Sequence, residues 1–398
     1  MDQPALAGIV VLELTTEIAG GYCGRLLAML GADVVKVESR LRPDVGRTAG
    51  PFPADLPHPE RSGLHRFLNA QKRSVALDVT TPSGAELLDR LAGRADVLLD
   101  DGTLGAPPAV KERYDALLAR HERLVVHAFS SYGLEGPKAA WASTELTDLA
   151  AGGWLQMAPP GSEPLMPGTP CAHQAAGTFG AVGVLLALAA RRRTGRGQLV
   201  ETRMNEALLS MLTCPTSVYA MAGVDGYRIG DAYPYAIYRC ADGHLGVSIL
   251  TQAHFVGLCT LMDRPDLADH PAYRRGEQRA APEAAAELHA IVTEWIADRP
   301  ALATFERGQA LRVPVAIVPS PTDVLASPQY ADRGYWVDVH DAELGPLRLP
   351  GLPFRLAHGG FAPFAPAPTV DADGDDVLGS IGVPAADRPA LARAGVLR

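Results

Sequence analysis

The chain has 398 residues, which is long enough for two domains of ordinary size, each with its own hydrophobic core. Hydrophobic residues make up 47% of it and charged residues 20%, as in globular rather than disordered proteins. The formal net charge of −9 argues against nucleic acid or an anionic membrane surface as the main partner.

The cysteines and the apolar stretches further limit the class of protein to which the chain can belong. The five cysteines are scattered, without a CxxC pair or the Cys/His spacing of a zinc site, so neither a disulfide framework nor a metal is indicated. The N-terminal residues lack the pattern of a secretory signal. The longest apolar stretch, residues 181–190, is too short to span a bilayer. We therefore expect a cytoplasmic enzyme or enzyme subunit without a metal.

The first 130 residues alternate short apolar runs with amphipathic segments. Strands are predicted over residues 9–14, 33–38, 74–79, 97–99 and 124–129, and helices over residues 19–30, 83–92 and 114–119. This alternation predicts an α/β fold with a doubly wound parallel sheet. Gly20, Gly21 and Gly24 lie where a dinucleotide-binding motif would begin, but they lack its first GxG spacing. We therefore interpret them as sites of close helix–strand packing.

The pattern changes after Gly223. Asp242-Gly243 between alternating apolar residues predicts a β-hairpin. Amphipathic helices over 254–261 and 284–296 and a strand over 313–318 complete a small α+β domain. We expect the large α/β domain to begin with residues 1–215, the small domain to comprise residues 225–325, and residues 330–398 to return to the large domain.

Residues 167–212 carry the strongest functional signal. They form a loop, a small-residue helix that ends in three arginines, and a TGRGQ turn into the next strand. Six further blocks occur in family order: GADVVKVES, NAQKRSVALDV, FSSYGLEGP, YRCADGHLGV, SPQYADRGYWVDV and LGPLRLPGLPFRLA. Together these segments resemble the family III CoA-transferases (CaiB/BaiF), the superfamily of formyl-CoA transferase and α-methylacyl-CoA racemase.

The resemblance covers nearly the whole chain and implies a specific assembly. Two protomers would interlock as a homodimer, because each chain passes through its partner. The large domain would hold coenzyme A or an acyl-CoA as substrate, and the small domain would cover the acyl end. Arg40, Lys72 and Arg73 are the candidates for binding the CoA phosphates, with solvated surface charge as the alternative interpretation.

The chain departs from the family at the residues that carry the chemistry. Counted back from the TGRGQ turn, the position of the family's nucleophilic aspartate is occupied by His173. The histidine–aspartate pair of the racemases corresponds to Thr144-Glu145. The arginine-bearing CoA loop corresponds to residues 101–105, and an assisting glutamine to Ile18. The resemblance therefore implies a degenerate active site.

His173 cannot take over the aspartate's part in the family reaction. That reaction passes through an aspartyl-CoA thioester, which an imidazole cannot form as a stable species. His173 could instead act as a general base or acid, with Glu145 as a second group and proton abstraction α to a thioester as the reaction class. Because a helix N-terminus disfavours the imidazolium, we expect a lowered His173 pKa and a neutral ring near pH 7. A purely structural His173 at the helix start is the alternative.

Two functions of different class remain open. The first is an enzyme of acyl-CoA metabolism, either a CoA-transferase or a racemase- or lyase-type proton-transfer enzyme that uses His173 and Glu145. The second is a catalytically silent subunit in a heterodimer with a competent paralogue. Loss of the nucleophile, the glutamine and the loop arginine together favours the second, because a repurposed enzyme would keep its CoA contacts.

Overall fold

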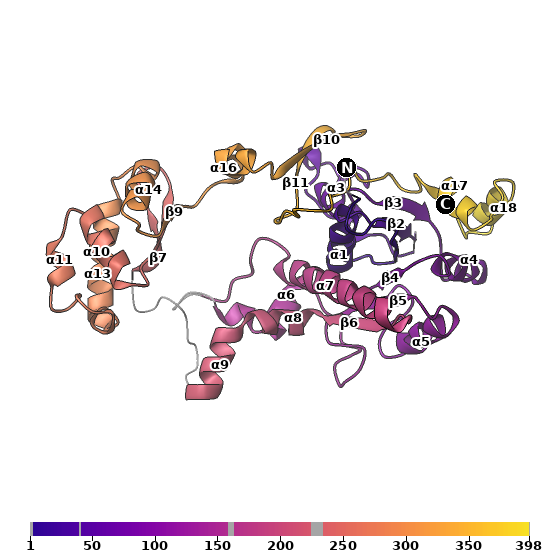
Figure 1. The fold of residues 1–398 in the computed structure, drawn as a ribbon, viewed down its shortest axis with the longest axis horizontal. Coiled ribbons are helices and arrows are strands. Elements are labelled where there is room, and N and C mark those ends of the chain that lie inside the picture. Colours follow the sequence, from indigo (N-terminus) through magenta and orange to yellow (C-terminus); the bar gives the residue numbers. More distant parts are fainter. Residues whose placement is uncertain (1–2, 40, 158–162, 224–233, 398) are drawn as a thin grey trace. The chain divides into compact units, whose positions relative to one another are not determined.

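The computed structural model describes residues 3–39, 41–157, 163–223 and 234–397. The chain divides into two units, each with its own internal contacts. Unit 1 comprises residues 1–213 and 334–398, and unit 2 comprises residues 214–333. The chain therefore builds unit 2 as an insertion and then returns to unit 1 (Figure 1).

A six-stranded parallel sheet with the order β3-β2-β1-β4-β5-β6 forms the centre of unit 1. Its strands are β1 (Val10–Glu13), β2 (Asp33–Glu38), β3 (Arg73–Ala76), β4 (Val97–Asp100), β5 (Val125–Ser130) and β6 (Leu199–Arg203). The predicted parallel α/β sheet is thereby confirmed. The strand order reverses between β1 and β4, and α/β sheets bind ligands beyond the carboxyl ends of the strands at such a point.

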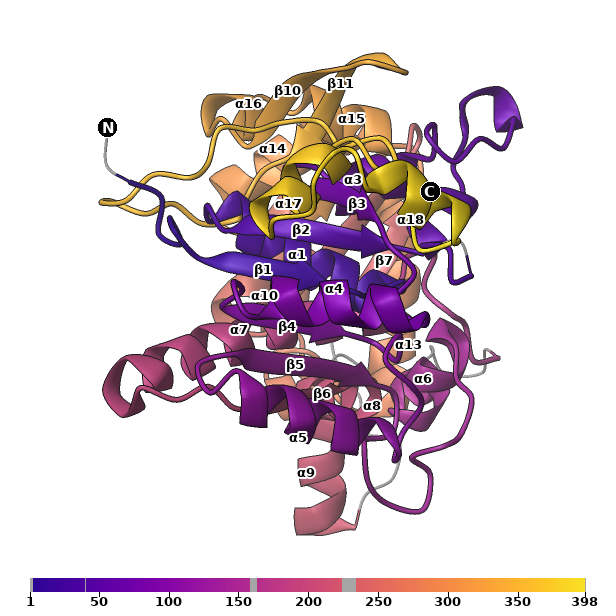
Figure 2. The same cartoon turned by 90° about the vertical axis from the view of Figure 1, so that its right-hand side faces the viewer.

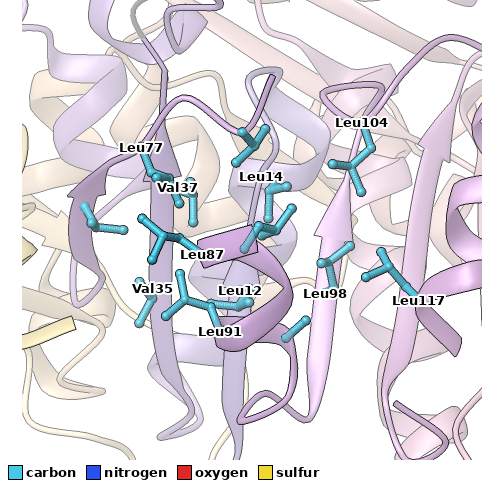
Figure 3. Close-up of a cluster of buried hydrophobic side chains, with 14 of the residues drawn as sticks. Leu12, Leu14, Val35, Val37, Leu77, Leu87, Leu91, Leu98, Leu104 and Leu117 are labelled. Atoms are coloured by element: carbon cyan, nitrogen blue, oxygen red, sulfur yellow. The ribbon is translucent and has the colours of Figure 1, made fainter. Parts of the chain in front are cut away.

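Helices cover both faces of this sheet. On one face lie α1 (Ile18–Met29) and α7 (Cys171–Thr194), and on the other lie α4 (Pro82–Ala92) and α5 (Val110–Arg120), which Figure 2 shows in front of the strands. Because successive strand residues point to opposite faces, Val11 and Leu12 of β1 belong to different cores. Figure 3 shows the core that contains Leu12. Each Leu or Val buried there contributes roughly 1.5–3 kcal/mol.

The TGRGQ turn connects α7 to β6 for local steric reasons. Gly195 ends α7 in the left-handed conformation, with φ of 74°. A Cβ on Gly197 would lie 1.8 Å from the Leu124 carbonyl oxygen, so only glycine allows this approach to the beginning of β5. The Gly197 N–H donates to the Glu122 carbonyl at 2.7 Å. The turn therefore sets β6 beside β5.

The helix α7 is the one helix in the described parts of the chain that is long and apolar enough to cross a membrane. Half of its most apolar window is buried within the protein. The core helix of a soluble protein has the same length and composition, and α7 packs against α1.

Short elements and the C-terminal segment complete unit 1. The segment after β11 packs at the β3 edge of the sheet, where the Asp373 N–H donates to the Ser74 carbonyl at 2.9 Å. The remaining elements of unit 1 are α2 (Val45–Thr48), α3 (Gly63–Leu68), α6 (Glu145–Ala151), α8 (Met204–Met211), β10 (Trp336–Asp341), β11 (Gly345–Pro350), α17 (Gly374–Ser380) and α18 (Arg388–Arg393), with 3₁₀ turns at Pro53–Asp55 and Trp154–Met157.

Unit 2 is an α+β unit. An antiparallel sheet with the order β7-β8-β9 comprises β7 (Tyr235–Arg239), β8 (His244–Ser248) and β9 (Val315–Ile317). The turn between β7 and β8 contains Asp242-Gly243, as the hairpin prediction requires. Its helices are α9 (Thr213–Ala222), α10 (Gln252–Leu261), α11 (Asp266–Asp269), α12 (Gly276–Arg279), α13 (Pro282–Ile296), α14 (Ala301–Ala310), α15 (Pro321–Ala326) and α16 (Pro328–Asp332).

Candidate functional site

A cavity of about 590 Å³ lies in unit 1, beyond the carboxyl ends of β1, β4 and β5. Its lining combines aromatic side chains such as Tyr132 and Trp141 with charged ones. The charged lining residues are Glu17, Arg42, Asp101, Glu145 and His173. Glu17 follows β1 and Asp101 follows β4, so the cavity lies at the point where the strand order reverses.

The first turn of α7 holds His173 at this cavity, with 7% of the residue exposed. The backbone N–H groups of Ala172 and His173 donate to the two carboxylate oxygens of Glu145, at 2.7 and 3.0 Å. Glu145 is the first residue of α6 and therefore caps the N-terminus of α7 from another helix. The sequence-predicted pair, His173 and Glu145, is brought together.

The imidazole ring of His173 lies between two carboxylates. Its Nε2 atom is 3.8 Å from a Glu145 oxygen and 3.6 Å from Asp148 Oδ2. Asp148 is fully buried and accepts a hydrogen bond from the Ser131 hydroxyl at 3.1 Å. The other ring nitrogen, Nδ1, has no hydrogen-bond partner among the described residues.

Because of these carboxylates, the pKa of His173 differs from the one expected from the sequence. Burial favours the neutral ring, but the hydrogen-bonding and charge of Asp148, and the charges of Glu145 and Glu17, outweigh burial and raise the His173 pKa above its ordinary value. The expectation of a lowered pKa was wrong. The N–H groups at the start of α7 are already used by Glu145, so the ring senses the carboxylates rather than the helix end.

This arrangement suits proton transfer better than thioester formation. A protonated imidazole beside a cavity can donate a proton to a bound ligand. Both oxygens of Glu145 are held by the α7 backbone, and the first turn of α7 contains no acidic residue. Within the described residues, no group of three or more His, Cys, Asp or Glu side chains is arranged to hold a metal ion.

Lys72 lies in the interior of unit 1, away from solvent. Its side chain is 0% exposed, and its ammonium group contacts Glu13 Oε2 at 2.6 Å, the Gly21 carbonyl at 2.8 Å and Asn69 Oδ1 at 2.9 Å. Burial, joined by the nearby charge of Lys36, lowers the Lys72 pKa to about 8. The role that this geometry supports for Lys72 is structural, because all three of these contacts lie in the interior.

Arg73 is the arginine candidate whose position the structure describes. Arg73 lies at the β3 edge of the sheet and pairs with Asp33 at 3.1 Å and Asp376 at 2.8 Å. Neither Lys72 nor Arg73 lines the cavity that holds His173. Arg40 lies outside the described residues.

Sequence reasoning missed two residues that face the cavity. Arg42 places its guanidinium within hydrogen-bond distance of the Thr16 and Thr103 hydroxyls, at 3.2 and 3.4 Å. Asp101 accepts hydrogen bonds from two backbone N–H groups at the start of α1. Asp101 belonged to the loop that departs from the family pattern, but only the fold shows that Arg42 covers that loop.

Comparison with known proteins gives the same family. Residues 6–374 match the family described as CoA-transferase family III. The chain is 31% identical to succinyl-CoA:mesaconate CoA-transferase of Haloarcula hispanica, over 95% of this chain and 97% of that protein. It is 28% identical to the succinyl-CoA–L-malate CoA-transferase alpha subunit of Chloroflexus aurantiacus, over 89% of this chain and 84% of that protein.

A solved structure has the same fold. The CaiB/BaiF family protein from Brucella suis superimposes with a TM-score of 0.83 and 26% identity, covering 96% of this chain and 100% of that one. The family match and the first relative each cover more than nine-tenths of the chain. This chain therefore belongs to CoA-transferase family III.

Proposed function

We propose that this protein is a subunit of a CoA-transferase that acts on acyl-CoA thioesters, and that a paralogous chain supplies the nucleophilic carboxylate. In this proposal the large domain binds coenzyme A or an acyl-CoA as substrate, without a metal, and the enzyme is cytoplasmic. The active site of this chain is degenerate, and its contacts with CoA are weakened.

The position of His173 carries the proposal. It occupies the start of α7 at the cavity, where the transfer reaction needs a carboxylate that can form a thioester. The neighbouring carboxylate of Glu145 is held by two backbone N–H groups, and that of Asp148 is fully buried. Neither is therefore a free nucleophile in this chain.

Two further observations support a partner chain. A relative with 28% identity is named as the alpha subunit of its transferase. The face of α7 that points away from the sheet carries four exposed apolar side chains, Phe179, Val182, Leu185 and Leu186, between 36% and 66% exposed. Exposed apolar patches of this kind are typical of protein interfaces. The partner is a second copy in a homodimer or, as we propose here, a paralogous subunit in a heterodimer.

An exchange assay tests the proposal. The purified chain should not exchange CoA between succinyl-CoA and free carboxylic acids. Mixing or co-expressing it with a paralogue that has aspartate at the position of His173 should give activity above that of the paralogue alone. Turnover by this chain alone, with a hydroxylamine-sensitive acyl-enzyme, would contradict the proposal and would locate the nucleophile.

A second function is favoured by the raised pKa of His173. In this racemase- or lyase-type reaction the Glu145 carboxylate accepts the α-proton of a thioester, and a protonated His173 imidazole returns a proton to the resulting carbanion. In that case the chain alone should incorporate deuterium from D₂O at the α-carbon. His173→Asn should lower the incorporation rate by about 10²–10⁴-fold.

A further inference from the structure

Asp101 has an unusual position at the cavity. It directly follows β4, and its side chain is 2% exposed. Its Oδ2 atom accepts hydrogen bonds from the N–H groups of Thr16 and Glu17, both at 2.7 Å. An internal carboxylate therefore fills the place before α1 where doubly wound proteins commonly bind a ligand phosphate.

The second oxygen of Asp101 accepts no hydrogen bond from the parts of the chain that the structure describes. Oδ1 is buried, and the Arg42 guanidinium lies 3.8 Å away, within ion-pair distance but too far for a hydrogen bond. Asp101 lines the same cavity as His173. An unpaired buried acceptor is unfavourable because it has lost its hydrogen bonds to water, and a ligand that donates to it removes that cost.

We propose that Asp101 is a ligand-binding residue: its Oδ1 atom accepts a hydrogen bond from a neutral donor of the ligand, a hydroxyl or amide N–H group, and its charge keeps phosphate groups away from this end of the cavity. The inference rests on the proposed function, because the ligand is taken to be a CoA thioester. The pantetheine or acyl part of the thioester, which carries such donors, then lies against Asp101.

The charges around Asp101 agree with a preference for neutral donors over phosphate groups. Among the described lining residues, Glu17 and Glu145 add negative charge, Arg42 is a cation, and the pKa of His173 is raised toward the charged form. The guanidinium of Arg42 is held at the rim by Thr16 and Thr103, with its side chain 41% exposed. The carboxylates of Asp101, Glu17 and Glu145 therefore disfavour a phosphate group inside the cavity.

Asp101→Asn is a specific test because it replaces one hydrogen-bond acceptor at the cavity by a donor. The amide oxygen can keep both hydrogen bonds from Thr16 and Glu17, so the amide NH₂ faces the cavity in place of Oδ1. An acceptor becomes a donor and one negative charge is removed. Asp115→Asn is the matched control, because Asp115 lies on α5, 56% exposed and paired with Lys111, outside the cavity lining.

The experiment uses isothermal titration of the full chain with two probes at about pH 8.5. Burial, together with the neighbouring charge of Asp100, raises the Asp101 pKa to about 7, so this pH keeps Asp101 ionised. Pantetheine is a neutral donor, and inorganic pyrophosphate is an anion. Asp101→Asn should weaken pantetheine binding about tenfold and tighten pyrophosphate binding about tenfold, while Asp115→Asn changes neither.

Unchanged affinity for both probes in Asp101→Asn, or weaker pyrophosphate binding, would overturn the proposal. If Asp101→Asn fails to fold, Glu17→Gln is the second variant, because it removes a negative charge from the same end of the cavity and breaks none of the hydrogen bonds described. Glu17→Gln should also tighten pyrophosphate binding. Unchanged pyrophosphate binding in Glu17→Gln would count against the proposal. If the unmodified protein does not bind pantetheine but Asp101→Asn gains pyrophosphate binding, the proposed function fails while the role of the Asp101 charge is supported.

Discussion

The properties of His173 come from residues that are distant in sequence. Glu145 and Asp148 of α6 approach the ring, and the Ser131 hydroxyl, which follows β5, holds Asp148 in place. The two carboxylates therefore favour the protonated form of the ring and raise its pKa. This environment determines what substitutions at position 173 can do.

His173→Asp restores the family residue but places a third carboxylate beside Glu145 and Asp148. Like charges at this distance disfavour ionisation of all three groups, and no cation replaces the lost imidazolium. We expect a lower melting temperature at neutral pH than in His173→Asn, and no gain of CoA exchange. Thermal denaturation and the exchange assay check both points. A clear gain of transferase activity would show that the rest of the site is intact.

The raised His173 pKa predicts a pH-dependent stability. A group whose pKa is higher in the folded than in the unfolded state adds stability below its unfolded pKa, and this stability is lost as the pH rises through the folded pKa. The loss of stability in His173→Asn should therefore be larger at about pH 5.5 than at about pH 9. Denaturant unfolding at the two pH values measures it. The effect should shrink in an Asp148→Asn background, and an equal loss at both pH values would contradict the assignment.

Substitution of Lys72 tests whether this residue stabilises the fold or binds the CoA phosphates. Removing one partner of a buried ion pair leaves the Glu13 carboxylate buried with only Lys36 opposite it, which costs about 3–5 kcal/mol. We expect Lys72→Ala to lower the free energy of unfolding by that amount. Lys111→Ala, which removes an exposed ion pair with Asp115, should have little effect. Weaker CoA binding by Lys72→Ala at unchanged stability would instead support the phosphate-binding role.

At the scale of elements, the glycines of α1 are explained by what packs against the helix. A Cβ on Gly24 would lie 1.8 Å from Glu13 Oε2, the oxygen that pairs with Lys72. A Cβ on Gly21 would make only ordinary contact with Leu68, at 3.5 Å. Close helix–strand packing thus requires glycine at position 24 but not at position 21.

This difference predicts opposite effects of the same substitution. Gly24→Ala should destabilise the protein by about 1–3 kcal/mol or more, because Glu13 must move away from Lys72. Gly21→Ala should be neutral or stabilise by up to about 1 kcal/mol, since alanine favours the helix. Denaturant unfolding of both variants provides the comparison. Equal destabilisation would show that the space around α1 is limiting at both positions.

At the scale of the whole molecule, the exposed apolar face of α7 is a candidate subunit interface. Leu186 is its most exposed member, at 66%. If this face binds another subunit, Leu186→Glu should shift the protein toward monomer in sedimentation velocity, because a charge would be buried without a partner. Leu302→Glu, at a residue 57% exposed in unit 2, is the control. Unchanged association in Leu186→Glu would place the subunit interface elsewhere.

The sequence by itself determined the architecture of the large domain. Strands buried on both faces are largely apolar, so β1 and β4 were predicted close to their observed positions, and β2 was too although it carries Lys36 and ends in Glu38. The TGRGQ turn was equally predictable, because its backbone requires glycine at positions 195 and 197. The turn residues Asp242-Gly243 also marked the hairpin, although Gly243 has no positive φ. His173 was identified by counting back from the TGRGQ turn, and Glu145 by its correspondence to the histidine–aspartate pair of the racemases.

Only the tertiary structure decided the electrostatics of the site. Whether a lysine such as Lys72 is buried or exposed depends on which carboxylate the fold brings near it. The hydrophobic periodicity of the sequence does not contain that information. The raised His173 pKa likewise arises from side chains of another helix, and the unpaired oxygen of Asp101 from the convergence of two loops at the strand ends. Local sequence patterns determine elements, whereas charge and hydrogen bonding in a cavity depend on distances between segments far apart in the chain.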